Sequence, residues 1–434
     1  MKATNQSIKR AFAASAVLAL VPLGAPVAGA TAATADCYDE NLPITVEESR
    51  LEVPTVPGAA PASEQLLEAG GFQTFVDKFD QRLCQMPNLK AASNLVEQHG
   101  RSLWRTAIDR AQGERPDLGW IDAYDDRPLY WAHLEATSAL RQYDPDFALS
   151  DEDRADLVKT FIYNARGLTD THFPRGNDVT RIRVSGFDPY SLNQEPRRSN
   201  PSGVIALQLD GMRIETDDGV IAIETVTLPV TWSGFNEGIV EDAFGPYLES
   251  GSPQLADLIM TISQGGSFNI EQWAGRWRGG SGDNNNEGTP EVIPEVDNWP
   301  MPQPPPEFIE TTLPYEAMVA ANTEPFSVQL NPRIREFNPE TGETRTHNDG
   351  PTGPPWVARS GGGGNYLSNE SQYRSNRVRL GLGQDELPGG HLHTPSQSYA
   401  SDDSVLLDES MQQRRHDIAD QAVALVIAAA EAVQ

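Results

Sequence analysis

The stretch from Ser360 to Asn369 reads SGGGGNYLSN, and a second stretch from Gly390 to Pro395 reads GHLHTP. A run of four glycines thus leads into Ser368, and a histidine follows at His393. A serine on a glycine-rich turn, paired with a histidine that can take its proton, is typical of a hydrolase. The two stretches therefore predict a nucleophile at Ser368 and a base in the segment around His393.

Six further segments stand in unbroken order between residue 180 and the second stretch. Together with these two, they resemble the pyroglutamyl peptidase I family of cysteine peptidases. The nucleophile segment matches that family's S-x-x-A-G-x-Y-x-C-N pattern at the first Ser, the Gly, the Tyr and the Asn, with Ser368 where the family has Cys. The other six segments are VSGFDPY (184–190), NPS (200–202), LPV (228–230), IEQWA (270–274), DNNNEG (283–288) and TTLP (311–314).

The resemblance implies an α/β fold over residues 180–434, a three-layer α/β/α domain with a mostly parallel sheet. It also implies that the protein removes N-terminal pyroglutamate from peptides and that no metal or other cofactor takes part. The site residues that it implies are Ser368, His393 and Glu271 as the catalytic triad, and Phe187, Tyr190 and Gln264 around the pyroglutamyl ring.

Two departures from the family pattern leave the activity open. A serine hydroxyl is far less acidic than a thiol, so Ser368 must lose its proton to His393 during the attack. The family's G-Q-A-G-G-R segment is reduced here to Gln264–Ser267, without its Arg. The alternatives are a catalytically inactive homologue that binds peptides or cell-surface ligands, and a serine hydrolase for a different acyl substrate.

His391 competes with His393, because two residues apart on a strand point to the same face. The Thr-Pro that follows His393 favours His393 as the base. The His-x-His pair could alternatively bind a metal, but no further ligand spacing supports that reading. We expect the glycine run 361–364 to let backbone N–H groups approach a substrate carbonyl, with a flexible loop as the alternative.

The remainder of the chain predicts a second domain ahead of the α/β domain. Apolar residues at helical spacing over 63–175 predict a small helical domain, joined to a Pro- and Ala-rich linker over 36–62. Strand patterns at 180–184, 220–232 and 258–262 alternate with helical patterns at 203–210 and 239–255. A final helix is predicted over 407–433, and residues 276–357 are predicted to be a long insertion of surface loops.

The N-terminus predicts export. Residues 1–35 combine a basic start, an apolar run and small residues before Asp36, as in a cleaved signal peptide, so we expect a secreted protein. In an oxidising compartment, Cys37 and Cys84 are expected to form a disulfide. The net charge of −29 disfavours nucleic acid and anionic membranes as partners. The resemblance to pyroglutamyl peptidase I implies a peptide substrate as the partner.

Overall fold

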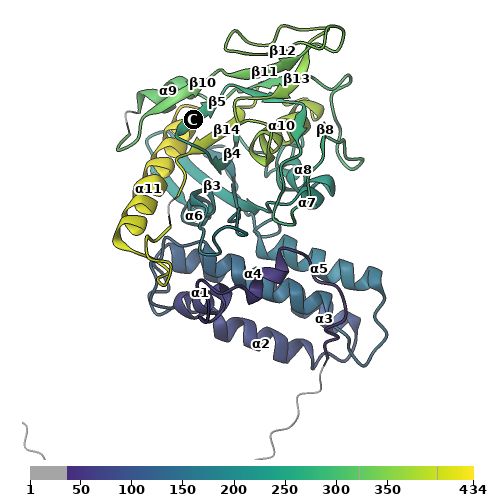
Figure 1. The fold of residues 1–434 in the computed structure, drawn as a ribbon. Helices are drawn as coiled ribbons and strands as arrows, with labels where there is room; N and C mark the ends of the chain where they lie inside the picture. Colours follow the sequence, from purple (N-terminus) through teal and green to yellow (C-terminus); the bar gives the residue numbers. More distant parts are fainter. Residues whose placement is uncertain (1–36, 322, 398) are drawn as a thin grey trace, which may run out of the picture. The chain divides into compact units, whose positions relative to one another are not determined.

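The computed structural model describes residues 37–321, 323–397 and 399–434 (Figure 1). The predicted signal peptide lies outside these residues. Within them, no helix is both long and apolar enough to cross a membrane.

Five α-helices make up most of the described N-terminal part and share one hydrophobic core. Local signals set their ends: the side chain of Asn88 caps α3, and Ser150 and Asp153 form the capping box that starts α5. Aromatic residues such as Trp104 and Trp131 fill the core. The helices are α1 (Ala62–Gly70), α2 (Gln73–Leu83), α3 (Leu89–Ala111), α4 (Arg127–Arg141) and α5 (Asp151–Ala165).

The disulfide between Cys37 and Cys84 is present, which confirms that prediction. It ties the segment before α1 to the end of α2. Residues 36–62 were expected to be a loose linker, but within the described part of this segment Glu47, Glu48, Arg50 and Leu51 are buried. The short helix η1 (Glu48–Glu52) buries Arg50, whose guanidinium donates to the backbone oxygen of Asn284 in the α/β part. The segment is fixed because buried charges of this kind need specific partners.

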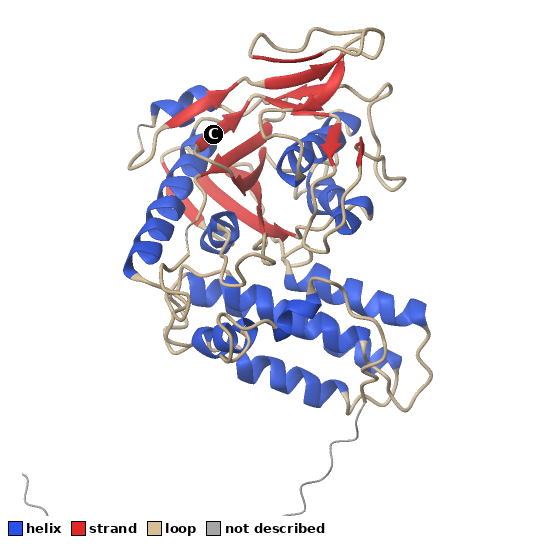
Figure 2. Cartoon of the chain, viewed as in Figure 1, coloured by secondary structure: helices blue, strands red, loops and turns tan. Residues whose placement is uncertain are grey.

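A seven-stranded sheet forms the centre of the remaining chain, in the order β10-β5-β14-β4-β1-β3-β2 (Figure 2). The neighbouring pairs β1–β3, β1–β4, β4–β14 and β5–β10 are parallel, and β2–β3 and β5–β14 are antiparallel. The strands are β1 (Val179–Phe187), β2 (Arg213–Thr216), β3 (Gly219–Leu228), β4 (Leu258–Gln264), β5 (Phe268–Glu271), β10 (Val328–Asn331) and β14 (Gly389–Thr394).

Helices cover both faces of this sheet (Figure 1). One apolar core lies under α6, α9 and α11, and another lies under α7, α8 and α10. The predicted three-layer α/β/α architecture with a mostly parallel sheet is therefore confirmed. The helices are α6 (Pro201–Leu209), α7 (Trp232–Asn236), α8 (Ile239–Phe244), α9 (Tyr315–Ala320), α10 (Leu367–Gly381) and α11 (Glu409–Glu431).

Two predicted segments differ from the structure. The helix expected over 239–255 ends at Phe244, because Gly245 and Pro246 turn the chain into the short helix η2 (Gly245–Tyr247). Residues 276–357 are also more than surface loops, since β10 extends the central sheet. The small sheets in or beside this region use β6 (Trp273–Gly275), β7 (Trp277–Gly279), β8 (Pro290–Val292), β9 (Phe308–Glu310), β11 (Ile334–Phe337), β12 (Thr344–His347) and β13 (Val357–Ser360).

Asp210, at the end of α6, makes stability depend on pH. Its Oδ1 accepts hydrogen bonds from the backbone N (2.6 Å) and the hydroxyl (3.2 Å) of Thr225. Burial, and then the charge of Glu224, raises the pKa of Asp210 to about 7. The folded state therefore binds this proton more tightly than the unfolded chain does, so stability falls as pH rises from about 4 to 7.

We expect Asp210→Asn, which can keep the Oδ1 contacts, to flatten the fall in stability between about pH 4 and 7. The shift corresponds to at most about 4 kcal/mol. Urea unfolding of the native protein and the variant at each pH measures the effect. High salt screens repulsion between surface charges but leaves this buried contribution, so a native slope that disappears entirely in salt would contradict the assignment.

Candidate active site

The antiparallel strands β5 and β14 bring the predicted residues Glu271 and His393 together, whereas the hydroxyl of Ser368 contacts Ser263 on β4. Ser368 lies in the first turn of α10, His393 lies on β14, and Glu271 is the last residue of β5. His393 is paired in register with Ser263 on β4, whose hydroxyl bonds to Ser368. The carboxyl ends of parallel strands are where α/β proteins bind ligands.

The pair formed by Glu271 and His393 is buried. Oε1 of Glu271 lies 2.6 Å from Nδ1 of His393, and Oε2 accepts a hydrogen bond of 2.7 Å from Nδ2 of Asn331. Asn331 sits opposite Glu271 in the register of β10 with β5. With Nδ1 held by a carboxylate, the proton-accepting position of the His393 ring is Nε2.

Three of the four glycines in the run have a role other than the one expected. The N–H groups of Gly361, Gly362 and Gly364 donate to backbone oxygens of the protein itself. A Cβ on Gly362 would lie 2.2 Å from Oε2 of Glu271, and one on Gly361 would lie 2.2 Å from the backbone oxygen of Trp273. These glycines therefore allow close packing around the Glu271 carboxylate, and these three N–H groups are not left for a substrate.

Ser368 opens onto a small cavity of about 60 Å³. Phe187, Tyr190 and Gln264, the three residues expected around a bound ring, line the same cavity. Phe187 is buried and stacks against Phe235, with ring centroids 6.1 Å apart. The cavity thus combines an apolar wall with the hydroxyl of Ser368.

His391 is fully buried behind the cavity. Its Nδ1 lies 2.7 Å from Oγ1 of Thr261, and its Nε2 lies 2.8 Å from Oγ of Ser263. Burial, and then the charge of His393, lowers the pKa of His391 well below its usual range. Both ring nitrogens therefore have hydroxyl partners, and among the residues described no group of three or more His, Cys, Asp or Glu side chains is arranged to hold a metal ion.

Sequence reasoning missed Ser263 and Asn331. Ser263 reads as one polar residue at the end of an apolar strand, and its contact with Ser368 depends on the pairing of β4 with β14 and the placement of α10. Asn331 lies within the predicted loop insertion, where we expected no strand beside Glu271. An alternating pattern in Val328–Asn331 was the one available signal.

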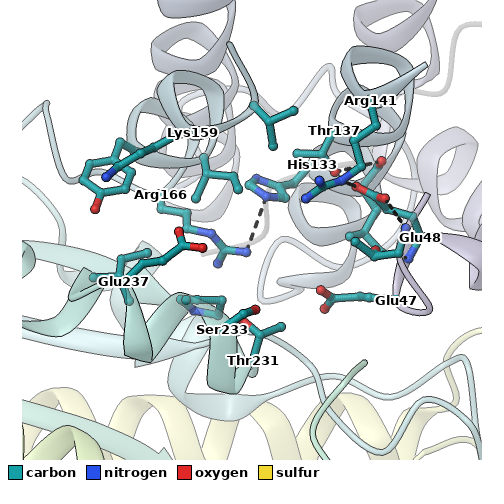
Figure 3. Close-up of a pocket in the computed structure, with 18 of the residues that line it drawn as sticks. Glu47, Glu48, His133, Thr137, Arg141, Lys159, Arg166, Thr231, Ser233 and Glu237 are labelled. Carbon is teal, nitrogen blue, oxygen red and sulfur yellow. Dashed lines mark hydrogen bonds and ion pairs between the residues drawn. The ribbon is translucent and has the colours of Figure 1, made fainter. Parts of the chain in front are cut away.

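A second, larger cavity of about 280 Å³ lies elsewhere, between the helical and α/β parts (Figure 3). Glu47 projects into it, with Oε1 held by the hydroxyl of Tyr130 (2.9 Å) and Nδ2 of Asn284 (2.8 Å). Arg166 enters from the other side; it pairs with Asp188 at 2.6 Å and lies 3.4 Å from Nε2 of His133. Burial raises the pKa of Glu47 to about 7.

Two family models match this chain. They are described as the PA0049 N-terminal domain, over residues 29–161, and the PA0049 C-terminal domain, over residues 181–303 and 331–398. The chain is 31% identical over 504 aligned positions to the uncharacterized protein PA0049 of Pseudomonas aeruginosa, and the alignment covers 91% of each chain.

Solved structures of two peptidases are similar to part of the chain. A mutant pyrrolidone carboxyl peptidase of Pyrococcus furiosus aligns with 17% identity and a TM-score of 0.38, covering 59% of this chain and all of that one. The pyroglutamyl peptidase I of Bacillus amyloliquefaciens aligns with 15% identity and a TM-score of 0.37, covering 58% of this chain and 97% of that one.

Proposed function

This chain belongs to the PA0049 family, and we propose that it is a secreted serine peptidase that removes N-terminal pyroglutamate from peptides. The observation that carries the proposal is the shared cavity. Ser368 opens onto it beside Phe187, Tyr190 and Gln264, and the pair His393–Glu271 stands at the same sheet edge. The sequence motifs around these residues resemble those of pyroglutamyl peptidase I, which supports the choice of substrate.

In this proposal Oγ of Ser368 attacks the carbonyl carbon of the pyroglutamyl amide while its proton passes to Nε2 of His393. Glu271 holds the ring and stabilises its charged form. The proton then moves to the leaving amine as the amide C–N bond breaks, which leaves an acyl ester on Ser368. Water, deprotonated by His393, cleaves that ester and releases pyroglutamate. This sequence calls for no cofactor.

The first turn of α10 is the natural place for the negative charge on the carbonyl oxygen. N–H groups in the first turn of a helix have no partners within the helix, and the helix dipole favours negative charge there. Ser368 stands in that turn. Donors fixed before the reaction begins are the most effective way to stabilise an oxyanion. The flat, apolar faces of Phe187 and Tyr190 suit a lactam ring between them.

The proposal of secretion rests on the signal-like sequence of residues 1–35, which lie outside the described structure. The disulfide between Cys37 and Cys84 supports it, because such bonds persist mainly in oxidising compartments. Cell fractionation of a tagged chain, with the N-terminal residue of the exported form identified, tests this part. A chain found only in the cytoplasm would contradict it.

The activity is tested with a fluorogenic pyroglutamyl-aminocoumarin substrate and the mature native protein. We expect cleavage that is lost in Ser368→Ala, and Ser368→Cys serves as the variant that carries the nucleophile of pyroglutamyl peptidase I. No cleavage by the native protein, with cleavage by Ser368→Cys, would overturn the proposed activity and indicate an intact pocket that binds without turnover.

A binding protein is the second candidate function, and the cavity around Glu47 and Arg166 favours it. This cavity is larger than the one at Ser368 and is lined by buried charged side chains of both signs. Oε2 of Glu47 has no hydrogen bond to another described residue. Carboxylate and guanidinium groups facing one cavity suit the two charged ends of a short peptide.

Under this second function, a dipeptide such as Ala-Ala raises the Tm of the native protein and of Ser368→Ala equally, because neither the cavity nor its charges involve Ser368. Glu47→Gln, which keeps the size of the side chain but not its charge, is expected to abolish the shift. A shift that survives Glu47→Gln, or no shift with any of a panel of dipeptides, would contradict binding in this cavity.

A further inference from the structure

A second set of hydrogen bonds reaches Ser368, separate from the pair His393–Glu271. Oγ of Ser263 lies 2.9 Å from Oγ of Ser368 and 2.8 Å from Nε2 of His391. On the far side of the ring, Oγ1 of Thr261 lies 2.7 Å from Nδ1 of His391. We call Thr261, His391 and Ser263 the serine arm.

The hydrogen bonds of the serine arm can all point in one of two directions, either toward Ser368 or away from it. Only these two arrangements are consistent, because each hydroxyl has one proton and a neutral imidazole has one N–H. His391 is neutral because its burial disfavours the charged form. If Ser368 gives its proton to His393, it must accept a hydrogen bond from Ser263. Ser263 then accepts from Nε2–H of His391, and Nδ1 accepts from the hydroxyl of Thr261. In the reverse direction, Ser368 donates to Ser263 instead.

The surroundings hold this arrangement in place. Thr261, Ser263 and His391 are all buried, and the first two face β14 from the neighbouring strand. Thr261 pairs in register with His391, and Ser263 with His393, so the two strands set the spacing of the hydroxyls and the rings. The rings of His391 and His393 meet edge to face, with centroids 4.8 Å apart.

We propose that Ser263, oriented by His391 and Thr261, donates a hydrogen bond to Oγ of Ser368 and thereby directs the proton of Ser368 to His393. The proposal rests on the proposed function, since it concerns the same nucleophile. Ser263 touches the reacting oxygen and is a catalytic residue in this account; His391 and Thr261 are positioning residues.

The chemistry explains why a serine nucleophile needs the arm. As the bond from Oγ to the carbonyl carbon forms, the Ser368 proton moves to Nε2 of His393, and negative charge builds up on Oγ. A hydroxyl reaches this state with more difficulty than a thiol does. The hydrogen bond from Ser263 stabilises that charge, while the protons of Ser263 and His391 stay where they are.

The test compares Ser263→Ala with Ser263→Thr, which restores the hydroxyl. With the pyroglutamyl-aminocoumarin substrate, we expect Ser263→Ala to lower kcat about 10- to 100-fold with KM nearly unchanged, the cost of one hydrogen bond to a group that becomes charged. Ser263→Thr is expected to recover most of kcat. A role in folding alone would move Tm without this split between kcat and KM, so Tm is measured for each variant.

Thr261→Val is a second test of the serine arm. It keeps the shape of the side chain and removes the hydroxyl that sets the His391 tautomer. A drop in kcat of about 3- to 10-fold is expected, the cost of one weakened hydrogen bond. The variant remains informative if Ser263→Ala does not fold.

Three outcomes would overturn the serine arm. If Ser263→Ala keeps the native kcat while Ser368→Ala is inactive, the proposed function holds but Ser263 does not assist Ser368. A Ser263→Ala variant as inactive as His393→Ala would mean that the proton leaves through Ser263 to His391, the reverse direction. Absence of any turnover by the native protein would remove both the proposed function and the arm.

Discussion

Glu271→Gln is expected to lower kcat by about 10³- to 10⁴-fold, as when the carboxylate of a catalytic triad is lost. The carboxylate accepts from Nδ1 of His393 at 2.6 Å and is fully buried. An amide of the same size can present its N–H₂ to Nδ1, which turns Nε2 into the protonated nitrogen. His393 then has no lone pair to take the proton of Ser368, although the pocket and KM are unchanged.

Asn331→Ala is the matched control for this prediction. It removes the other hydrogen bond to Glu271, from Nδ2 at 2.7 Å, but leaves the charge beside His393. We expect a fall in kcat of about tenfold, the cost of one lost hydrogen bond. If Glu271→Gln turned over substrate as fast as the native protein, Glu271 would have no part in orienting the base.

Glu370→Ala is expected to lower the free energy of unfolding by about 3–5 kcal/mol, the cost of breaking a buried ion pair from one side. Glu370 follows Ser368 by two residues in α10, and its carboxylate is fully buried. Arg278 donates from Nε to Oε2 (2.9 Å) and also pairs with Oε1, which accepts from Nε of Arg374 (2.7 Å). Without the carboxylate, two buried guanidinium groups lose their shared partner.

Glu97→Ala is the comparison for this loss. Glu97 pairs with Arg101 on α3, and both side chains are 41% exposed. An exposed pair of this kind contributes under about 1 kcal/mol. Urea unfolding of the two variants measures the contrast. If the two variants lost the same free energy of unfolding, Glu370 and its two arginines would stabilise the protein no more than a surface ion pair does, and they would not anchor the start of α10.

The parts of the fold that follow local rules could be predicted from the sequence. The strand patterns at 180–184, 220–232 and 258–262 predicted β1, β3 and β4, and the helical spacing over 63–175 predicted the helices of the N-terminal part. Each of these signals acts over a few residues.

The parts that depend on distant contacts could not be predicted. Arg50 lies in the segment predicted to be a linker, and it is buried because its guanidinium binds the backbone oxygen of Asn284, far along the chain. Ser263 and Asn331 gain their contacts from strand pairing, which no short pattern encodes. We expected the N–H groups of the glycine run to bind a substrate carbonyl. In the structure, the absence of side chains at Gly361 and Gly362 lets the backbone pack closely against Trp273 and Glu271.

The measurement that tests the central claim most directly is covalent labelling of the mature protein with a fluorophosphonate, followed by mass spectrometry of the modified peptide. The account predicts one label, on Ser368, that is absent from Ser368→Ala and greatly slowed in Glu271→Gln, because the reagent needs an activated serine. A protein that stays unlabelled, or carries its label on a serine other than Ser368, would contradict the claim that Ser368 is the nucleophile.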